Sequence, residues 1–262
     1  MRKLLAMEQR AMRLRAMTAK SLPRWASILC FALTATMPWP LPAQAVDIDD
    51  QTEVADHMHE HLTRITAIKA NVVMGNLDGV RAPAAWLADH DAVAGLPANF
   101  EPYVDLMRGF AREVLNASDL NSAGKSVSKM ARTCGNCHVV NHVELEFGYD
   151  QMPAEWADTI SHMQRHQWAA DRLWEGLIGP SDVAWSRGIA MLVDVPLLSD
   201  EVMDETAGSV DSGVLDEIAG RLHLLGDQGS DARSPDARSE LYGEILGLCA
   251  DCHTMLGRGP GH

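Results

Sequence analysis

Cys249-Ala250-Asp251-Cys252-His253 lies close to the C-terminal His262, and Cys134-Gly135-Asn136-Cys137-His138 repeats its spacing earlier in the chain. Both stretches read C-x-x-C-H, the spacing typical of covalent c-type haem attachment. Two thiols so spaced reach the two vinyl groups of one porphyrin, and the adjacent histidine lies beneath the iron. The sequence therefore predicts two haems c. Their attachment residues are Cys134, Cys137, Cys249 and Cys252, and their proximal iron ligands are His138 and His253.

Other uses of paired cysteines fit the pattern less well. Zinc sites built from two C-x-x-C pairs usually separate them by about 15–20 residues, whereas Cys134 and Cys249 are 115 positions apart. Thioredoxin-like dithiols need a βαβ setting, and no such pattern is present. A structural disulfide does not require a histidine after each pair. Haem attachment is therefore the favoured interpretation.

The first 45 residues have the layout of a cleaved secretory signal peptide. Seven Lys or Arg residues precede an apolar stretch over about 25–39, and Ala43-Gln44-Ala45 offers a small-x-small cleavage site. A membrane anchor is the alternative, but the apolar stretch is shorter than the ~20 residues that a span needs. We expect export to the periplasm and loss of Cys30 with the signal peptide.

Without residues 1–45, the chain keeps 15 basic and 35 acidic residues, a net charge of −20. This charge makes nucleic acid and anionic membrane surfaces poor partners. We expect instead a redox partner protein with a basic docking patch. Solubility is the plainer explanation of the charge, and homo-oligomerisation is left open.

An internal duplication divides the mature chain. His57-Met58-His59-Glu60-His61 resembles His162-Met163-Gln164-Arg165-His166, and each copy ends in C-x-x-C-H. A repeat of this length indicates two similar domains rather than a solenoid of short units. We assign 46–148 to the first domain and 149–262 to the second. About ten extra residues in the second copy are predicted to form a loop between Leu197 and Gly213.

Apolar spacing predicts four helices in each copy and essentially no strands, so the fold class is all-α. In the first copy they cover about 54–72, 83–93, 101–115 and 118 to the haem motif, with Ser118 as a helix N-cap. In the second copy they cover about 153–177, 182–193, 212–226 and 236–255. The Gly- and Ser-rich stretch 226–236 is predicted to be a loop.

Little sequence follows the second motif, so the opposite side of its iron is expected to be built from upstream helices. This arrangement resembles the class II cytochromes c, which are cytochrome c-prime and its low-spin relatives. The resemblance covers nearly all of 46–262, twice, and implies two tandem antiparallel four-helix bundles, each with C-x-x-C-H on its last helix. Two departures stand out. Neither motif is followed by the family's basic residue, since Val139-Val140-Asn141 and Thr254-Met255-Leu256 lack one, although Arg258 is near. The family is also commonly a single bundle.

The resemblance also implies that the distal iron ligand lies on the first helix of each copy. His61 and His166 are the favoured distal ligands, and Met58 and Met163 are the alternatives, with an open iron as a third state. His57 and His162 are expected at the surface or against a haem propionate. His59 and His142 have no counterparts and are expected to be surface residues.

Two filled irons in rigid bundles suit electron transfer, so we expect an electron carrier rather than an enzyme. A gas-binding protein for nitric oxide or carbon monoxide is one alternative, which needs an open iron. A haem subunit of a larger oxidoreductase is another, and the acidic surface is compatible with it.

Overall fold

The described part of the chain is mostly helical, which confirms the all-α prediction. A computed structural model describes residues 48–90, 96, 98–147, 151–154, 159–194, 204 and 210–257. These residues include eight α-helices and no strand. The helices are α1 (Ile48–Val73), α2 (Arg81–Asp89), α3 (Glu101–Leu115), α4 (Leu120–Val140), α5 (Thr159–Ile178), α6 (Asp182–Asp194), α8 (Ser212–Asp231) and α9 (Pro235–Met255). The predicted signal peptide and most of the predicted loop at 197–213 lie outside the described residues.

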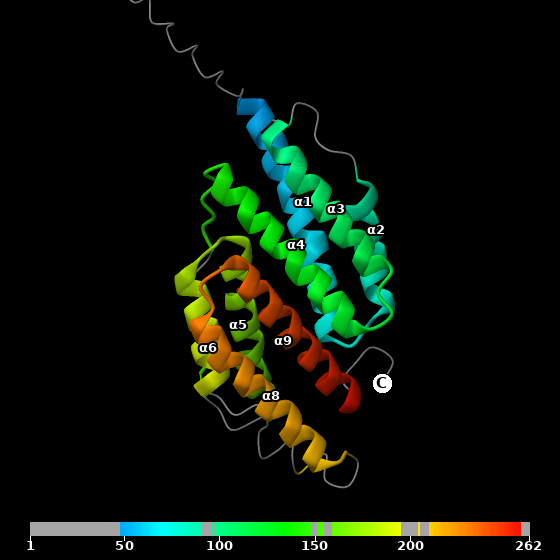
Figure 1. The fold of residues 1–262 in the computed structure, drawn as a ribbon, viewed down its shortest axis with the longest axis vertical. Coiled ribbons are helices and arrows are strands. Elements are labelled where there is room, and N and C mark those ends of the chain that lie inside the picture. The colour runs from blue at the N-terminus through cyan, green and yellow to red at the C-terminus, as the bar shows by residue number, and fades with distance from the viewer. Residues whose placement is uncertain are drawn as a thin grey trace, which may run out of the picture. The chain divides into compact units, whose positions relative to one another are not determined.

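Neighbouring helices form two sets of contacts within residues 46–262, which make one compact unit (Figure 1). In the first set, α1 contacts α2 and α4, and α3 contacts α2 and α4. In the second set, α5 contacts α6 and α9, and α8 contacts α6 and α9. We call the described residues up to 147 the first half and those from 151 onward the second half.

The most extensive helix contact joins the two halves through α4 and α9. Gly124 of α4 faces the carbonyl oxygen of Gly243 on α9, and Ser128 Oγ donates a 2.5 Å hydrogen bond to the Ser239 carbonyl. The later of the two α4 residues thus contacts the earlier of the two α9 residues, so the two helices run antiparallel. Small side chains at this contact let the two backbones approach closely.

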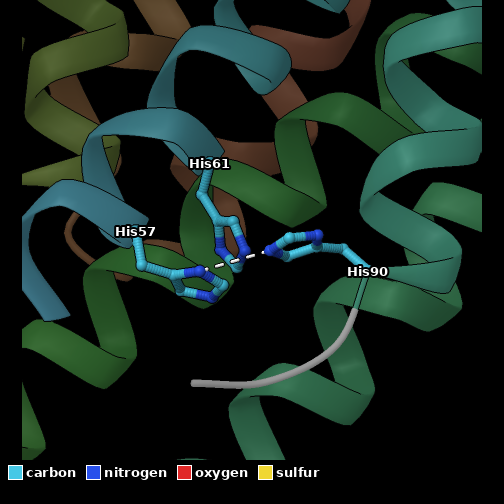
Figure 2. A group of neighbouring side chains, drawn as sticks. All are labelled: His57, His61 and His90. Carbon is cyan, nitrogen blue, oxygen red and sulfur yellow. Dashed lines mark hydrogen bonds between the residues drawn. The ribbon is translucent and has the colours of Figure 1, made fainter. Parts of the chain in front are cut away.

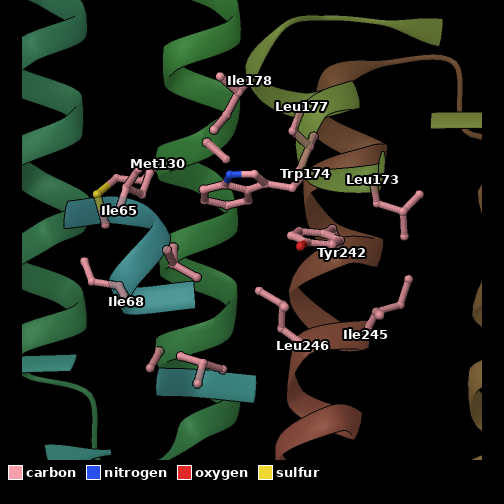
Figure 3. Close-up of a cluster of buried hydrophobic side chains, with 14 of the residues drawn as sticks. Ile65, Ile68, Met130, Leu173, Trp174, Leu177, Ile178, Tyr242, Ile245 and Leu246 are labelled. Carbon is pink, nitrogen blue, oxygen red and sulfur yellow. The ribbon is translucent and has the colours of Figure 1, made fainter. Parts of the chain in front are cut away.

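One buried cluster extends through both halves (Figure 3). It includes Ile65 and Ile68 of α1 together with Trp174 of α5, and Tyr242 of α9 is fully buried within it. Because a buried hydroxyl needs a partner, the Tyr242 hydroxyl donates a 3.0 Å hydrogen bond to the Ala170 carbonyl. The two halves therefore share one core.

Two predicted boundaries are wrong. Helix α4 is capped by Asp119, not Ser118, because the Asp119 carboxylate accepts a 2.7 Å hydrogen bond from the Ser122 amide. The predicted loop at 226–236 is too long, since α8 continues to Asp231 and only 232–234 separate it from α9. Its glycines serve close packing instead: Gly229 is buried against Ile189, and its carbonyl accepts a 2.9 Å hydrogen bond from the Trp185 indole.

None of the helices in the described part of the chain has the length and apolar character needed to cross a membrane.

Candidate functional site

Both C-x-x-C-H motifs lie in the last turns of a helix. Cys134, Cys137 and His138 belong to the end of α4, and the second motif occupies the same place at the end of α9. Residues three apart on a helix share a face, so each pair of sulfurs can serve one ligand. All four thiols are free and partly buried.

Each motif histidine makes one hydrogen bond, and the two bonds are equivalent. His138 Nδ1 lies 2.8 Å from the carbonyl oxygen of Ile178, the last residue of α5. His253 Nδ1 lies 2.7 Å from the carbonyl oxygen of Val73, the last residue of α1. Each bond crosses from one half of the chain to the other.

These bonds determine which ring nitrogen of each imidazole carries the proton. A carbonyl oxygen can only accept, so Nδ1 must carry the proton and donate. In the neutral ring, Nε2 then keeps its lone pair free for a metal. Metal-binding histidines usually donate their second N–H to a carbonyl or carboxylate in this way, which orients the ring and raises its basicity.

The helix ends provide these acceptors for a simple reason. The last four carbonyls of an α-helix have no partner within the helix, so the ends of α1 and α5 present free acceptors. Gly75 lets α1 stop sharply, since it takes φ +74 and the Asn76 amide donates 2.8 Å back to the Asn71 carbonyl. Such left-handed glycine ends are common at helix C-termini.

Close packing holds each motif against the other half. A Cβ atom added to Gly135, within the first motif, would overlap the carbonyl oxygen of Leu177 on α5. A Cβ atom on Gly75 would lie 2.6 Å from Thr254 Oγ1, next to the second motif. Each half therefore completes the surroundings of the other half's motif histidine.

The thiols are poorly suited to redox catalysis as cysteines. Burial, followed by the neighbouring motif thiol, raises the pKa of Cys134 and of Cys249 to about 12. Burial also raises the pKa of Cys137 and of Cys252. Catalytic dithiols instead have lowered pKa values, because the thiolate is the nucleophile.

Three histidines gather near the start of α1 (Figure 2). His57 and His61 lie one turn apart on α1, with ring centroids 4.3 Å apart. His90, at the end of α2, completes the group, and its Nε2 lies 3.2 Å from His57 Nδ1. The Trp86 ring stacks on His90 at 3.7 Å and meets His61 edge-on at 5.4 Å.

His61 is the most unusual of the three. Its Nε2 is shielded from solvent and has no hydrogen-bond partner. Burial, followed by the neighbouring His57, His90 and Arg108, lowers its pKa from 6.5 to about 3. The ring is therefore neutral near pH 7, with a buried nitrogen that could accept a metal.

The equivalent region of the second half has two histidines. His162 and His166 lie on α5 with ring centroids 4.5 Å apart, close to the spacing of His57 and His61. His162 is only 8% exposed, and His166, Met58 and Met163 are partly buried.

Some of the histidines predicted to lie at the surface are exposed, and others are not. His59 and His142 are exposed, as predicted. His162 is buried rather than at the surface, whereas His57 is partly exposed and contacts His61 and His90. Contact of either residue with a haem propionate stays a prediction.

The sequence gives no signal for His90 or Trp86. Neither belongs to the duplicated motif, and His90 is 29 positions after His61. Only the packing of α2 against α1 brings them to the cluster.

Comparison with known proteins found no matching family model, no matching curated protein and no matching solved structure.

Proposed function

We propose that the chain is a periplasmic dihaem c-type cytochrome that transfers electrons between redox partners. The observation that carries this proposal is the paired setting of the two C-x-x-C-H motifs. Both end a helix, and both present an imidazole whose Nδ1 proton is held by a carbonyl of the opposite half.

The residues fit two covalent haems. The motif spacing supplies two partly buried thiols and one free imidazole nitrogen at each site. On the distal side, the unpartnered Nε2 of His61 is a buried polar atom that a sixth iron bond would satisfy. When bound, haem would supply an iron that gains and loses one electron.

The two sets of helix contacts support a finer description of the fold as two tandem four-helix bundles. In each set, the first and last helices touch and the motif lies on the last helix. Figure 1 draws α1 and α4 running in opposite directions, which brings the start of α1 towards the motif end of α4. A distal ligand on α1 or α5 is consistent with this arrangement.

For the sixth iron bond, His61 and His166 remain the favoured residues, and Met58 and Met163 the alternatives. Bis-histidine ligation gives a lower reduction potential than His/Met ligation. In both cases the chain's own task is to hold the ligands still, exclude water and set the field around each site.

The shared core supports two rigid sites that act separately, because α4 and α9 run antiparallel and their motif ends lie at opposite ends of the helix pair. The motif histidines are each fixed by the other half, and α4 and α9 pack through small residues. Rigid surroundings limit the rearrangement that accompanies a change in iron charge. The acidic chain would meet a basic surface on its partner, with electrostatic steering of the encounter.

The test is low-temperature electron paramagnetic resonance of the oxidised, purified protein, combined with its mass. Two haem masses and two low-spin signals are expected, and the signals distinguish bis-His from His/Met iron. Carbon monoxide should leave the ferrous spectrum unchanged on mixing. A mass without haem ends the proposal, and rapid carbon monoxide binding at both irons favours gas binding instead.

A further inference from the structure

We propose that His57, His61 and His90 form a second kind of site, which binds one divalent transition-metal ion through three imidazoles. Within the described residues, this is the only group of three such side chains close enough to share an ion. One ring nitrogen from each histidine lies within 4.8 Å of the other two. The inference goes beyond the proposed function and does not require haem.

The spacing suits a small ion with nitrogen ligands. Zinc takes imidazole nitrogens at about 2.0–2.1 Å in tetrahedral geometry, which puts neighbouring ligands roughly 3.3 Å apart. His57 Nδ1 and His90 Nε2 are already 3.2 Å apart. Figure 2 shows His61 turned towards the same point from the next turn of α1.

Two of the ligands would lie on one helix face. His57 and His61 are four residues apart, the spacing that places two histidines of a helix on one metal. The third, His90, is held by its backbone: its amide donates 2.8 Å to the Trp86 carbonyl, and its carbonyl accepts from the Arg108 guanidinium. The site is thus largely preformed.

His61 also fits an ion, through the same buried nitrogen that a sixth iron bond would satisfy. Its Nε2 is buried without a partner, which is rare for a polar atom unless a water or an ion satisfies it. The Trp86 ring stacks on the face of the His90 ring and so restricts the rotation of that imidazole. Three imidazoles and one open position form the ligand set of catalytic zinc sites, and imidazole also suits copper and nickel.

The charges around the cluster are of both signs. Glu53 and Glu60 act favourably on a cation at His57, whereas Arg108 acts unfavourably at His61. Arg64 is paired with Glu60 at 3.1 Å and lies over Trp86. The imidazoles rather than the local charge must therefore supply the affinity.

The ion and the first haem compete for His61. If His61 caps the iron, it is withheld from the ion; if Met58 caps the iron, all three imidazoles are free. Among its described residues, the second half brings no third ligand side chain close enough to His162 and His166 to share an ion with them. One ion per chain is therefore expected, and its site lies in the first half.

The experiment measures zinc bound to the full mature chain of the Cys134→Ala/Cys137→Ala variant, in which no iron competes for His61, after treatment with a chelator, by equilibrium dialysis and elemental analysis. We expect one tightly bound zinc per chain. His90→Gln should weaken binding by more than the roughly 10–100-fold that loss of an outer-shell partner costs. His59→Gln is the matched control, because His59 is exposed on the same helix.

Haem content and circular dichroism of the same samples separate the possible failures. Absence of tight zinc in the Cys134→Ala/Cys137→Ala variant, or equal zinc binding when His90→Gln is added to it and the chain stays well folded, overturns the site. If these samples contain no haem but still bind zinc, the result counts against the proposed function alone.

Discussion

The motif regions of the two halves agree in their surroundings, whereas the histidine clusters on the first helix of each half differ. At the ends of α4 and α9, both imidazoles donate to the last carbonyl of a helix from the other half, at 2.8 and 2.7 Å. The first half then gathers three histidines and Trp86, while the described residues of the second half show only a histidine pair.

This difference separates a feature that the two halves share from one that they do not. The motif histidines are constrained by helix-end carbonyls, which need donors, and on the proposed function also by the spacing of two thioethers. The histidine cluster of the first half depends on α2, whereas α6, the second helix of the other half, is of a different length. If two haems are present, their reduction potentials should therefore differ.

The largest expected effect comes from removing one attachment pair at a time. Cys134→Ala/Cys137→Ala and Cys249→Ala/Cys252→Ala should each reduce the protein's mass by one haem, because on the proposed function each pair attaches its own porphyrin. Intact-protein mass spectrometry measures the loss.

Cys30→Ala is the control, and it should leave both haems in place. Two haems in either double variant would contradict the assignment of one motif to one haem.

The ion pair between the halves gives the next largest effect. Lys69 is only 5% exposed, and its ammonium lies 2.5 Å from the Asp171 carboxylate of α5. Asp171→Asn leaves that buried charge without its anion, so we expect a loss of about 3 kcal/mol in the free energy of unfolding. Urea denaturation measures it.

An exposed pair provides the comparison for this loss. Arg81 Nε lies 3.5 Å from Asp78 Oδ1, and both side chains are well exposed. Asp78→Asn should therefore lower the free energy of unfolding by less than about 1 kcal/mol. Equal losses of unfolding free energy in the two variants would mean that the Lys69–Asp171 pair contributes no more to stability than an exposed ion pair does.

A glycine substitution can perturb one motif and spare the other. In Gly135→Ala, the new Cβ overlaps the Leu177 carbonyl and should push α5 away from His138. Overpacking of this kind costs about 2 kcal/mol. Weakening the bond to Ile178 should also raise the potential of the first haem, because the imidazole becomes less basic.

Spectroelectrochemical titration measures both potentials, and the second should not move. Gly109→Ala is the control, since nothing lies within 4 Å of the added Cβ, and it should stabilise α3 by up to about 1 kcal/mol. Equal shifts of both potentials would show that the motif environments are not separate.

The smallest expected effect is a pH dependence specific to the first half. His61 has its pKa lowered from 6.5 to about 3 in the folded chain, so between these values the unfolded chain binds more protons. Stability therefore falls as pH decreases from 6.5 towards 3. We expect a loss of about 1 kcal/mol between pH 6.5 and 5, allowing for partial exposure.

Chemical denaturation at both pH values measures this loss, and the Cys134→Ala/Cys137→Ala variant avoids interference from iron. His61→Leu should flatten the dependence, whereas His59→Leu, at an exposed position, should not. A slope that persists in His61→Leu would assign it to another group.

Much of the fold follows from local pattern. The range Glu101–Leu115 was predicted to be a helix and is one. The predicted loop at 226–236 was too long, because glycines favour loops locally but here permit close contact between α8 and α6. Local composition cannot distinguish these two uses of glycine.

The sequence by itself determined the helical class and the two C-x-x-C-H motifs, because helix periodicity and thiol spacing are local properties of the chain. Only the tertiary structure decided which carbonyl each motif histidine contacts and which histidines meet His61. Val73 and His253 are 180 positions apart, and no local pattern relates them. Their contact depends on how α1 and α9 pack, which the whole shared core determines.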